Sequence, residues 1–193
     1  MRGWKKLEIH SAFNNCNSMK HIKFPSTITV IRNRAFLCCN YLTKVELNEG
    51  LLEIEACSFY ECNSLNEINI PATTKIIGRW AFSKSNLKDP HLPDGLENIG
   101  GGAFCDCKLT NFKIPPLVTT IPRNMLKRCK SMVPLKISAN LIQIDNGAFG
   151  GCISPRNIAL SPSTVVDEYA FYNFTDLLQV FGVVEAIITA LRT

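Results

Sequence analysis

The sequence lacks any apolar run long enough to cross a membrane. A membrane helix needs roughly 18 to 20 consecutive apolar residues, and no stretch approaches that length. The first ten residues carry basic side chains but not the apolar segment of a signal peptide. These absences predict a protein without a membrane span in an intracellular, cytoplasmic location. The alternative is a cell-surface location, if the native N-terminus precedes Met1.

Residues and motifs that catalysis requires are also scarce. The three histidines, His10, His21 and His91, lie in no H-E-x-x-H, G-x-S-x-G or catalytic Cys/His context. The run Gly100-Gly101-Gly102 lacks the Lys-Ser/Thr of a P-loop and the spacing of a dinucleotide-binding fingerprint, so it predicts a tolerant turn. Carboxylates do not pair at repeated positions. The sequence therefore predicts no enzyme, no cofactor and no metal site.

Charge is modest as well, at 19% charged residues and a net charge of +5. This surplus does not by itself imply nucleic acid. Hydrophobic residues make up 46% of the chain, so a buried core is expected and general disorder is not. One basic cluster, Arg123, Lys127, Arg128 and Lys130, indicates either a solvated loop or a site for an acidic partner. Aromatic residues do not interleave with it, so nucleic acid is not expected.

What the sequence has instead is a repeat of 22 or 23 residues. Each unit is anchored on a pair of residues that is usually small-Phe. One unit is too small to bury its own apolar face, so neighbouring units must stack and share a core. The anchors are Ala12-Phe13, Ala35-Phe36, Ser58-Phe59, Ala81-Phe82, Ala103-Phe104, Met125-Leu126, Ala148-Phe149 and Ala170-Phe171.

Other positions keep phase with the anchor. After each anchor, apolar residues alternate with polar ones, as in Glu67-Ile68-Asn69-Ile70, which predicts a short strand with one buried face. Proline often follows and, because it cannot donate to a ladder, it indicates that the chain turns there. An aliphatic residue precedes most anchors by five positions, and these residues predict a buried row. They are Ile31, Ile54, Ile77, Ile99, Ile121, Ile144 and Val166.

The nine cysteines follow the repeat too. Equivalent residues of stacked units would lie about 4.8 Å apart with parallel Cβ vectors, whereas a disulfide needs Cβ atoms about 3.8 Å apart that point together. The cysteines therefore predict buried free thiols, which favour a reducing compartment. A metal or redox site at Cys38-Cys39 or Cys105-Asp106-Cys107 stays open, although neither has a second pair at zinc-finger spacing. Six cysteines share one repeat position: Cys16, Cys39, Cys62, Cys107, Cys129 and Cys152.

These motifs resemble the BspA-type leucine-rich repeats, whose unit reads roughly L-x-x-I-x-I-P-x-x-V-x-x-I-x-x-x-A-F-x-x-C-x-x. The resemblance covers about Phe13 to Phe171 and is carried by the joint recurrence of Ala-Phe-x-x-Cys and Ile-Pro. It implies a β-rich leucine-rich-repeat solenoid of right-handed coils of 22–23 residues, with a parallel sheet on one face. It also implies a role in molecular recognition, at microbial surfaces and inside protist cells.

Departures from the pattern predict where the array is irregular. Pro90 stands where a strand apolar residue is expected, Met125-Leu126 replaces Ala-Phe, and Ser154-Pro155-Arg156 replaces a Leu position. Residues 1–181 are expected to form the solenoid, with about eight coils and an incomplete first one. Residues 182–193 have apolar side chains at helical spacing, which favours a short helix capping the last coil over one more half-repeat.

The strand alternation identifies a candidate binding face. If Ile22 and Phe24 point inward, their neighbours point outward, and equivalent residues form two columns on the exposed sheet. Because solenoids bind through their extended faces, we predict a monomeric, non-enzymatic module that binds a protein partner through this sheet. The alternative is a fragment of a cell-surface adhesin that binds host or matrix molecules. The candidate face comprises His21, Lys23, Lys44, Glu46, Glu67, Asn69, Asp89, His91, Asn111, Lys113, Lys136 and Asn157.

Overall fold

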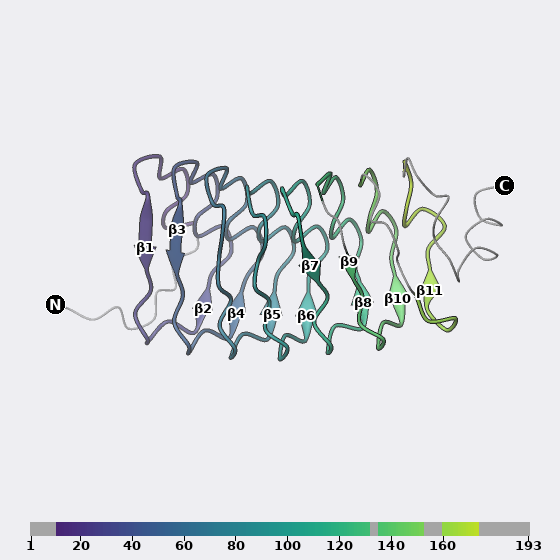
Figure 1. The fold of residues 1–193 in the computed structure, drawn as a ribbon. Coiled ribbons are helices and arrows are strands. Elements are labelled where there is room, and N and C mark those ends of the chain that lie inside the picture. The colour runs from purple at the N-terminus through teal and green to yellow at the C-terminus, as the bar shows by residue number, and fades with distance from the viewer. Residues whose placement is uncertain (1–10, 132–134, 153–159, 174–193) are drawn as a thin grey trace.

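The computed structural model describes residues 11–131, 135–152 and 160–173, which wind into a rod of stacked coils (Figure 1). Successive coils follow one another along the rod in chain order, and all strand pairs are parallel. The described residues contain no helix, and hence none that could cross a membrane. The predicted solenoid is confirmed. The expected cap at 182–193 and the irregularity at Ser154-Pro155-Arg156 lie outside the described residues.

Four of the strands predicted from the Ile-x-Ile alternation form the first of two ladders, whereas the strand predicted at Glu67-Ile68-Asn69-Ile70 is reduced to a single bridge. β1 pairs with β3, with Ile22 opposite Val45, and β7 pairs with β9. Between β3 and β7, the described part of this ladder has no strand pair and is reduced to an isolated bridge from Asn69 to His91. The adjacent Pro90 has no N–H to donate, so the irregularity predicted there is confirmed. The strands are β1 (His21–Lys23), β3 (Lys44–Glu46), β7 (Phe112–Lys113) and β9 (Leu135–Lys136).

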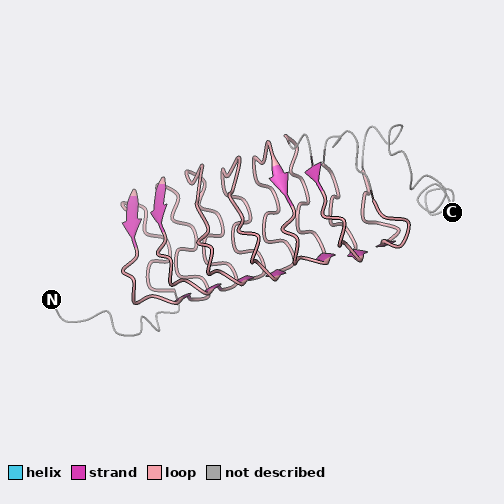
Figure 2. Cartoon of the chain, turned by 60° about the horizontal axis from the view of Figure 1, so that its bottom comes forward, coloured by secondary structure: helices cyan, strands magenta, loops and turns pink. Residues whose placement is uncertain are grey.

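A second parallel ladder runs along another face of the rod, where the sequence marked only a buried row (Figure 2). Each strand ends on one of the repeated aliphatic residues; Ile54, Ile77 and Ile121 are fully buried. Two residues per coil are too few to show the alternation that predicts a strand. The strands are β2 (Val30–Ile31), β4 (Glu53–Ile54), β5 (Ile76–Ile77), β6 (Asn98–Ile99), β8 (Thr120–Ile121), β10 (Gln143–Ile144) and β11 (Val165–Val166).

Proline divides this second ladder between β6 and β8. In other coils, the N–H that follows the aliphatic residue donates to the aliphatic carbonyl of the preceding coil. Gly100 N donates to Ile77 O at 2.7 Å, and Asp145 N donates to Ile121 O at 2.9 Å. The equivalent residue after Ile121 is Pro122, which has no N–H. The strands on either side of this position therefore belong to separate sheets.

The anchor turns carry a third row of hydrogen bonds between coils. Phe59 N donates to Ala81 O at 2.8 Å, and Leu126 N donates to Ala148 O at 2.9 Å in the same way. The turns place the residues two positions before and two positions after the second residue of the anchor pair, usually Phe, in the left-handed region of φ. Most of these residues are not glycine: Ser11, Asn15, Arg34, Cys38, Cys57, Glu61, Trp80, Lys84, Asp106, Asn124, Arg128 and Asn173.

We expect Arg34→Gly to raise the free energy of unfolding by up to about 1 kcal/mol. Arg34 is exposed and has a φ of 57°. The left-handed region costs a residue with a Cβ roughly 1 to 2 kcal/mol, more than the roughly 0.5 to 1 kcal/mol that glycine loses through chain flexibility. Urea unfolding measures the change. Arg79→Gly is the control, because Arg79 is exposed without a positive φ, and it should destabilise. Equal losses in both variants would contradict the prediction.

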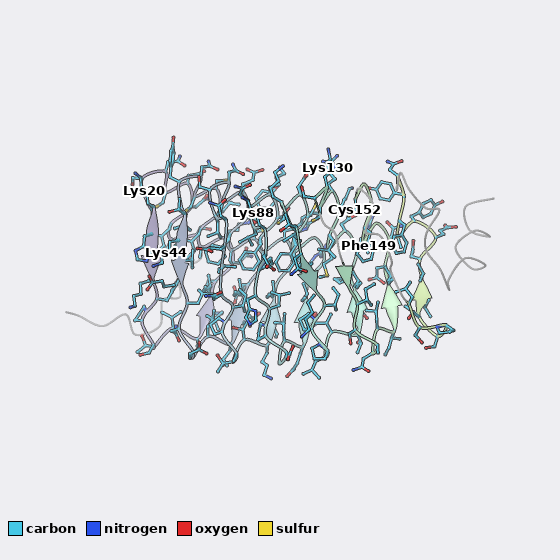
Figure 3. All side chains as sticks on the ribbon, in the orientation of Figure 1. Lys20, Lys44, Lys88, Lys130, Phe149 and Cys152 are labelled. Carbon is cyan, nitrogen blue, oxygen red and sulfur yellow. The ribbon has the colours of Figure 1, made fainter. Side chains whose placement is uncertain are left out.

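The anchor phenylalanines form the predicted spine through the centre of the rod. The rings of Phe13, Phe36, Phe59, Phe82 and Phe104 stack with centroids 5.2 to 5.5 Å apart and planes within 15° of parallel. Leu126 interrupts the stack, which resumes with Phe149 on Phe171 at 5.0 Å. Figure 3 shows Phe149 and Cys152 inside the rod and Lys130 at its outer margin.

At Gly78 and Gly100, the backbone of the preceding coil lies where a side chain would stand. A Cβ on Gly78 would lie 2.6 Å from Ala56 N, and one on Gly100 would lie 2.6 Å from the carbonyl carbon of Gly78 and would overlap Arg79 N. These are backbone atoms that cannot rotate away. The sequence predicts a tolerant turn at Gly100-Gly101-Gly102, and for Gly100 this is wrong, because the preceding coil leaves no room for a side chain.

Gly100→Ala should therefore lower the free energy of unfolding by about 3 kcal/mol, at the upper end of the range for overpacking a tight interior. Gly95→Ala is the matched control. Its Cβ would meet nothing closer than 3.5 Å, so it should change stability by less than about 1 kcal/mol. Urea unfolding of both variants checks this. Similar values for the two would show that the coils can separate at Gly100 without cost.

Candidate binding groove

A groove of ≈ 1260 Å³ lies over the first ladder and extends from Lys23 in one coil to Lys113 several coils later. Its floor is formed by the coil segments that carry the first ladder, whose apolar residues such as Ile68 and Phe112 are buried. The outward residues of these segments line it, together with neighbouring apolar residues and prolines such as Ile70, Pro71 and Pro90. The groove is therefore a direct product of the strand alternation.

Nine of the twelve residues of the candidate face line this groove. His21 is exposed beside it and hydrogen-bonds to Glu46. Lys136 is placed in β9 by its backbone, and its side chain is not described. Asn157 lies outside the described residues. The nine are Lys23, Lys44, Glu46, Glu67, Asn69, Asp89, His91, Asn111 and Lys113.

Some lining residues follow the strands and are not predicted by the sequence pattern. Glu49 and Asp94 lie in the segments after β3 and after the bridge at His91, and both face the groove. Strand alternation cannot assign them, because it ends at the turn. Their shared place, shortly after the strand in each repeat, was the signal that could have identified them.

Glu46 lies within ion-pair distance of three basic side chains at the end of the groove over β1 and β3. Its carboxylate lies 2.6 Å from Lys44 Nζ, 3.1 Å from His21 Nε2 and 3.6 Å from Lys23 Nζ. The hydrogen bond from Lys44 holds the pKa of Glu46 below its usual value. All four side chains are substantially exposed, so these pairs position charge rather than stabilise the fold.

The middle of the groove is acidic. The bridge from Asn69 to His91 sets the register, and a hydrogen bond from Lys88 N to Asn66 O at 3.2 Å places Glu67 beside Asp89. Both carboxylates are exposed. Across residues 11–131, 135–152 and 160–173, no ion pair joins either of them to a cation. Like charges directly opposite on adjacent strands are destabilising.

The cysteine row is structural, as predicted. All nine cysteines are free. Five thiols of the row each donate a hydrogen bond to an anchor carbonyl of the preceding coil: Cys39, Cys62, Cys107, Cys129 and Cys152. Cys62 Sγ lies 3.1 Å from Phe36 O, and Cys152 Sγ lies 3.0 Å from Leu126 O. Burial raises the pKa of Cys152 to about 12. Within the part of the chain that the structure describes, no three His, Cys, Asp or Glu side chains gather as a metal site would need.

The basic cluster lies on the anchor turns and not in the groove. Arg128 pairs with Asp106 at 3.3 Å, and Lys127 Nζ lies 5.5 Å from the centre of the Tyr172 ring. Arg123 and Lys130 are exposed. Two of the four charges thus interact within the chain, and a site for an acidic partner at this cluster stays a prediction.

The comparisons with known proteins agree with the repeat. The family described as the BspA type leucine rich repeat region matches residues 9–133 and 75–184, in six copies. No curated protein matches the chain.

Three solved structures share the fold. The T. pallidum leucine-rich repeat protein is 32% identical with a TM-score of 0.64, over 68% of this chain and 61% of that one. A leucine-rich repeat protein from Bacteroides ovatus is 25% identical with a TM-score of 0.69, over 87% and 50%. The pneumococcal vaccine antigen PcpA, at 24% identity and a TM-score of 0.54 over 79% and 33%, shows the fold alone. The chain spans less than two thirds of each of these structures, and it belongs to the BspA-type leucine-rich repeat family.

Proposed function

We propose that the chain is a non-enzymatic recognition module that binds a protein partner in the groove over the first ladder. The observation that carries the proposal is the groove, a hollow of ≈ 1260 Å³ lined by outward strand residues from successive coils. Extended solenoid faces of this kind are built for large partners, because each coil adds another pair of exposed side chains.

The chemistry of the lining supports binding over catalysis. The groove offers ammonium, carboxylate, amide and imidazole groups, which serve recognition through hydrogen bonds and ion pairs. No cysteine lines the groove among the described residues. Two thiols of the buried row are poor nucleophiles, because burial raises the pKa of Cys39 to about 11 and that of Cys107 to about 12, and the reactive form is the thiolate.

A steric block tests the groove without altering its charge. Asn69 is exposed at its centre, so Asn69→Trp should abolish capture of a partner identified by affinity purification and then measured by titration calorimetry. Asn98→Trp is the control, since Asn98 is an exposed asparagine on the second ladder and outside the groove. If Asn98→Trp loses the partner while Asn69→Trp keeps it, the second ladder and not the groove is the binding face.

We place this module in a reducing compartment. Nine free cysteines support this location, because unpaired thiols persist where the cell keeps them reduced. Labelling intact cells with a membrane-impermeant reagent should leave the protein unmodified. Labelling at the cell surface would instead favour an adhesin that binds host or matrix molecules.

A further inference from the structure

The groove carries a charge opposite in sign to that of the chain. The whole chain has a net charge of +5. The groove has a formal charge of −2 when His91 is neutral, so the basic surplus of the chain lies elsewhere. The charged residues lining it are the carboxylates Glu46, Glu49, Glu67, Asp89 and Asp94 and the lysines Lys23, Lys44 and Lys113.

This acidity is concentrated in the middle of the groove. Near one end, Glu46 is paired with lysines, and near the other, Lys113 Nζ lies 2.9 Å from Asp94. The two central carboxylates, Glu67 and Asp89, have no such ion pair among the described residues. An occupant therefore meets ends whose formal charges sum to zero, although Glu49 has no ion pair among the described residues, and two negative charges at the centre.

The spacing of the coils favours an arginine guanidinium over a lysine ammonium as the cation bound at the centre of the groove. Neighbouring strands of a ladder are about 4.8 Å apart, which places the Glu67 and Asp89 side chains next to each other across two coils. A guanidinium presents five N–H donors in a planar fork and can serve two carboxylates at once, whereas an ammonium is a compact point charge. An arginine held there would also relieve the repulsion between the two carboxylates.

We propose that the groove receives a basic protein segment, with one arginine bridging Glu67 and Asp89. The inference rests on the proposed function, since it names the kind of partner that the groove accepts. Two amide groups also line the groove, from Asn69, two residues after Glu67, and from Asn111, one coil after Asp89. The lysines around Glu46 disfavour further positive charge over β3, so the basic residues of the segment lie over its centre.

Three fluorescent peptides of otherwise uniform Gly-Ser sequence test the proposal, with a central Arg-Ser-Arg, Lys-Ser-Lys or Glu-Ser-Glu. Fluorescence anisotropy titrations with the full chain measure their dissociation constants at low and at physiological salt. The Arg peptide should bind at least about tenfold more tightly than the Glu peptide and several-fold more tightly than the Lys peptide. Its binding should weaken as salt rises, because exposed charges are screened.

The double variant Glu67→Gln with Asp89→Asn should weaken binding of the Arg peptide about tenfold or more. Its melting temperature should equal or exceed that of the unmodified chain, which shows that the fold is kept. Glu97→Gln with Glu168→Gln is the matched control. Both residues are exposed and outside the groove, and the net charge changes equally, so binding should stay within about twofold. An equal loss in the control pair, or equal binding of the three peptides, would overturn the proposal.

The purified partner separates this inference from the proposed function. If Asn69→Trp abolishes its capture and the Glu67→Gln, Asp89→Asn variant does not, the groove binds protein but the arginine bridge is wrong. If neither variant weakens capture, the proposed function fails as well. Loss of capture in both variants, with the control pair unaffected, supports both.

Discussion

Phe59→Ala should lower the free energy of unfolding by roughly 3 to 5 kcal/mol. Phe59 is fully buried and stacks on Phe36 at 5.2 Å and on Phe82 at 5.4 Å. Removing its ring leaves a cavity bounded by two coils whose backbones are fixed by hydrogen bonds, so the site cannot collapse. Urea unfolding of the variant gives the value directly.

Leu126→Phe provides the comparison for this spine. Leu126 is buried at the one described anchor position where the stack lacks a ring. A phenylalanine there changes the shape of the side chain more than its burial, so we expect Leu126→Phe to change the free energy of unfolding by less than about 1.5 kcal/mol. A cost below about 1 kcal/mol for Phe59→Ala would contradict the shared core, since ordinary surface substitutions fall in that range.

Raising the pH above about 9 should destabilise the protein steeply through its thiol row. Burial raises the pKa of Cys39 from 9.0 to about 11, and those of Cys107 and Cys152 to about 12. The unfolded chain loses these protons near pH 9 while the folded chain keeps them. The contribution is therefore complete below pH 9 and is lost as the pH rises towards 11 to 12, at about 2 kcal/mol per thiol by pH 10.5.

The urea midpoint measured from pH 7 to 10.5 checks this, and single variants separate the thiols from lysine and tyrosine. Cys62 belongs to the row, and burial raises its pKa as well. In Cys62→Ala, the stability should therefore fall less steeply with pH, because one titrating thiol fewer contributes. Leu65→Ala is the control, because Leu65 is equally buried but does not titrate. It should lower stability at every pH without changing the slope. A slope in Cys62→Ala identical to that of the parent chain would refute the linkage.

The sequence was sufficient wherever one residue type recurs for one physical reason. The ring of Phe59 and the aliphatic side chain of Ile77 each need only a repeating apolar contact, so their spacing alone predicts the spine and the buried row. The same holds for the groove residues Glu67 and Asn69, whose outward direction follows from the strand period.

Other features depend on how the coils meet and have no local signature. Trp80 has a φ of 57°, a conformation that the stacked turn imposes against the preference of its own side chain. Glycine is required at position 100 because the backbone of the preceding coil is too close for a Cβ, and no turn motif in the sequence indicates this. The effect of Pro122 required the register between coils, because only there does its missing N–H fall on the ladder.

Pro122 also determines how the rod responds to a pulling force. Coils stacked end to end carry an axial load in series, so every junction bears the same force and the least bonded junction yields first. Strand pairing in the second ladder is continuous from β2 to β6 and from β8 to β11 but transmits no load across the gap. There the load falls on turn bonds such as that from Phe104 N to Met125 O and on the β7–β9 pair of the first ladder. We expect the force that opens this junction in single-molecule stretching to depend on these two sets of bonds, with no contribution from the second ladder.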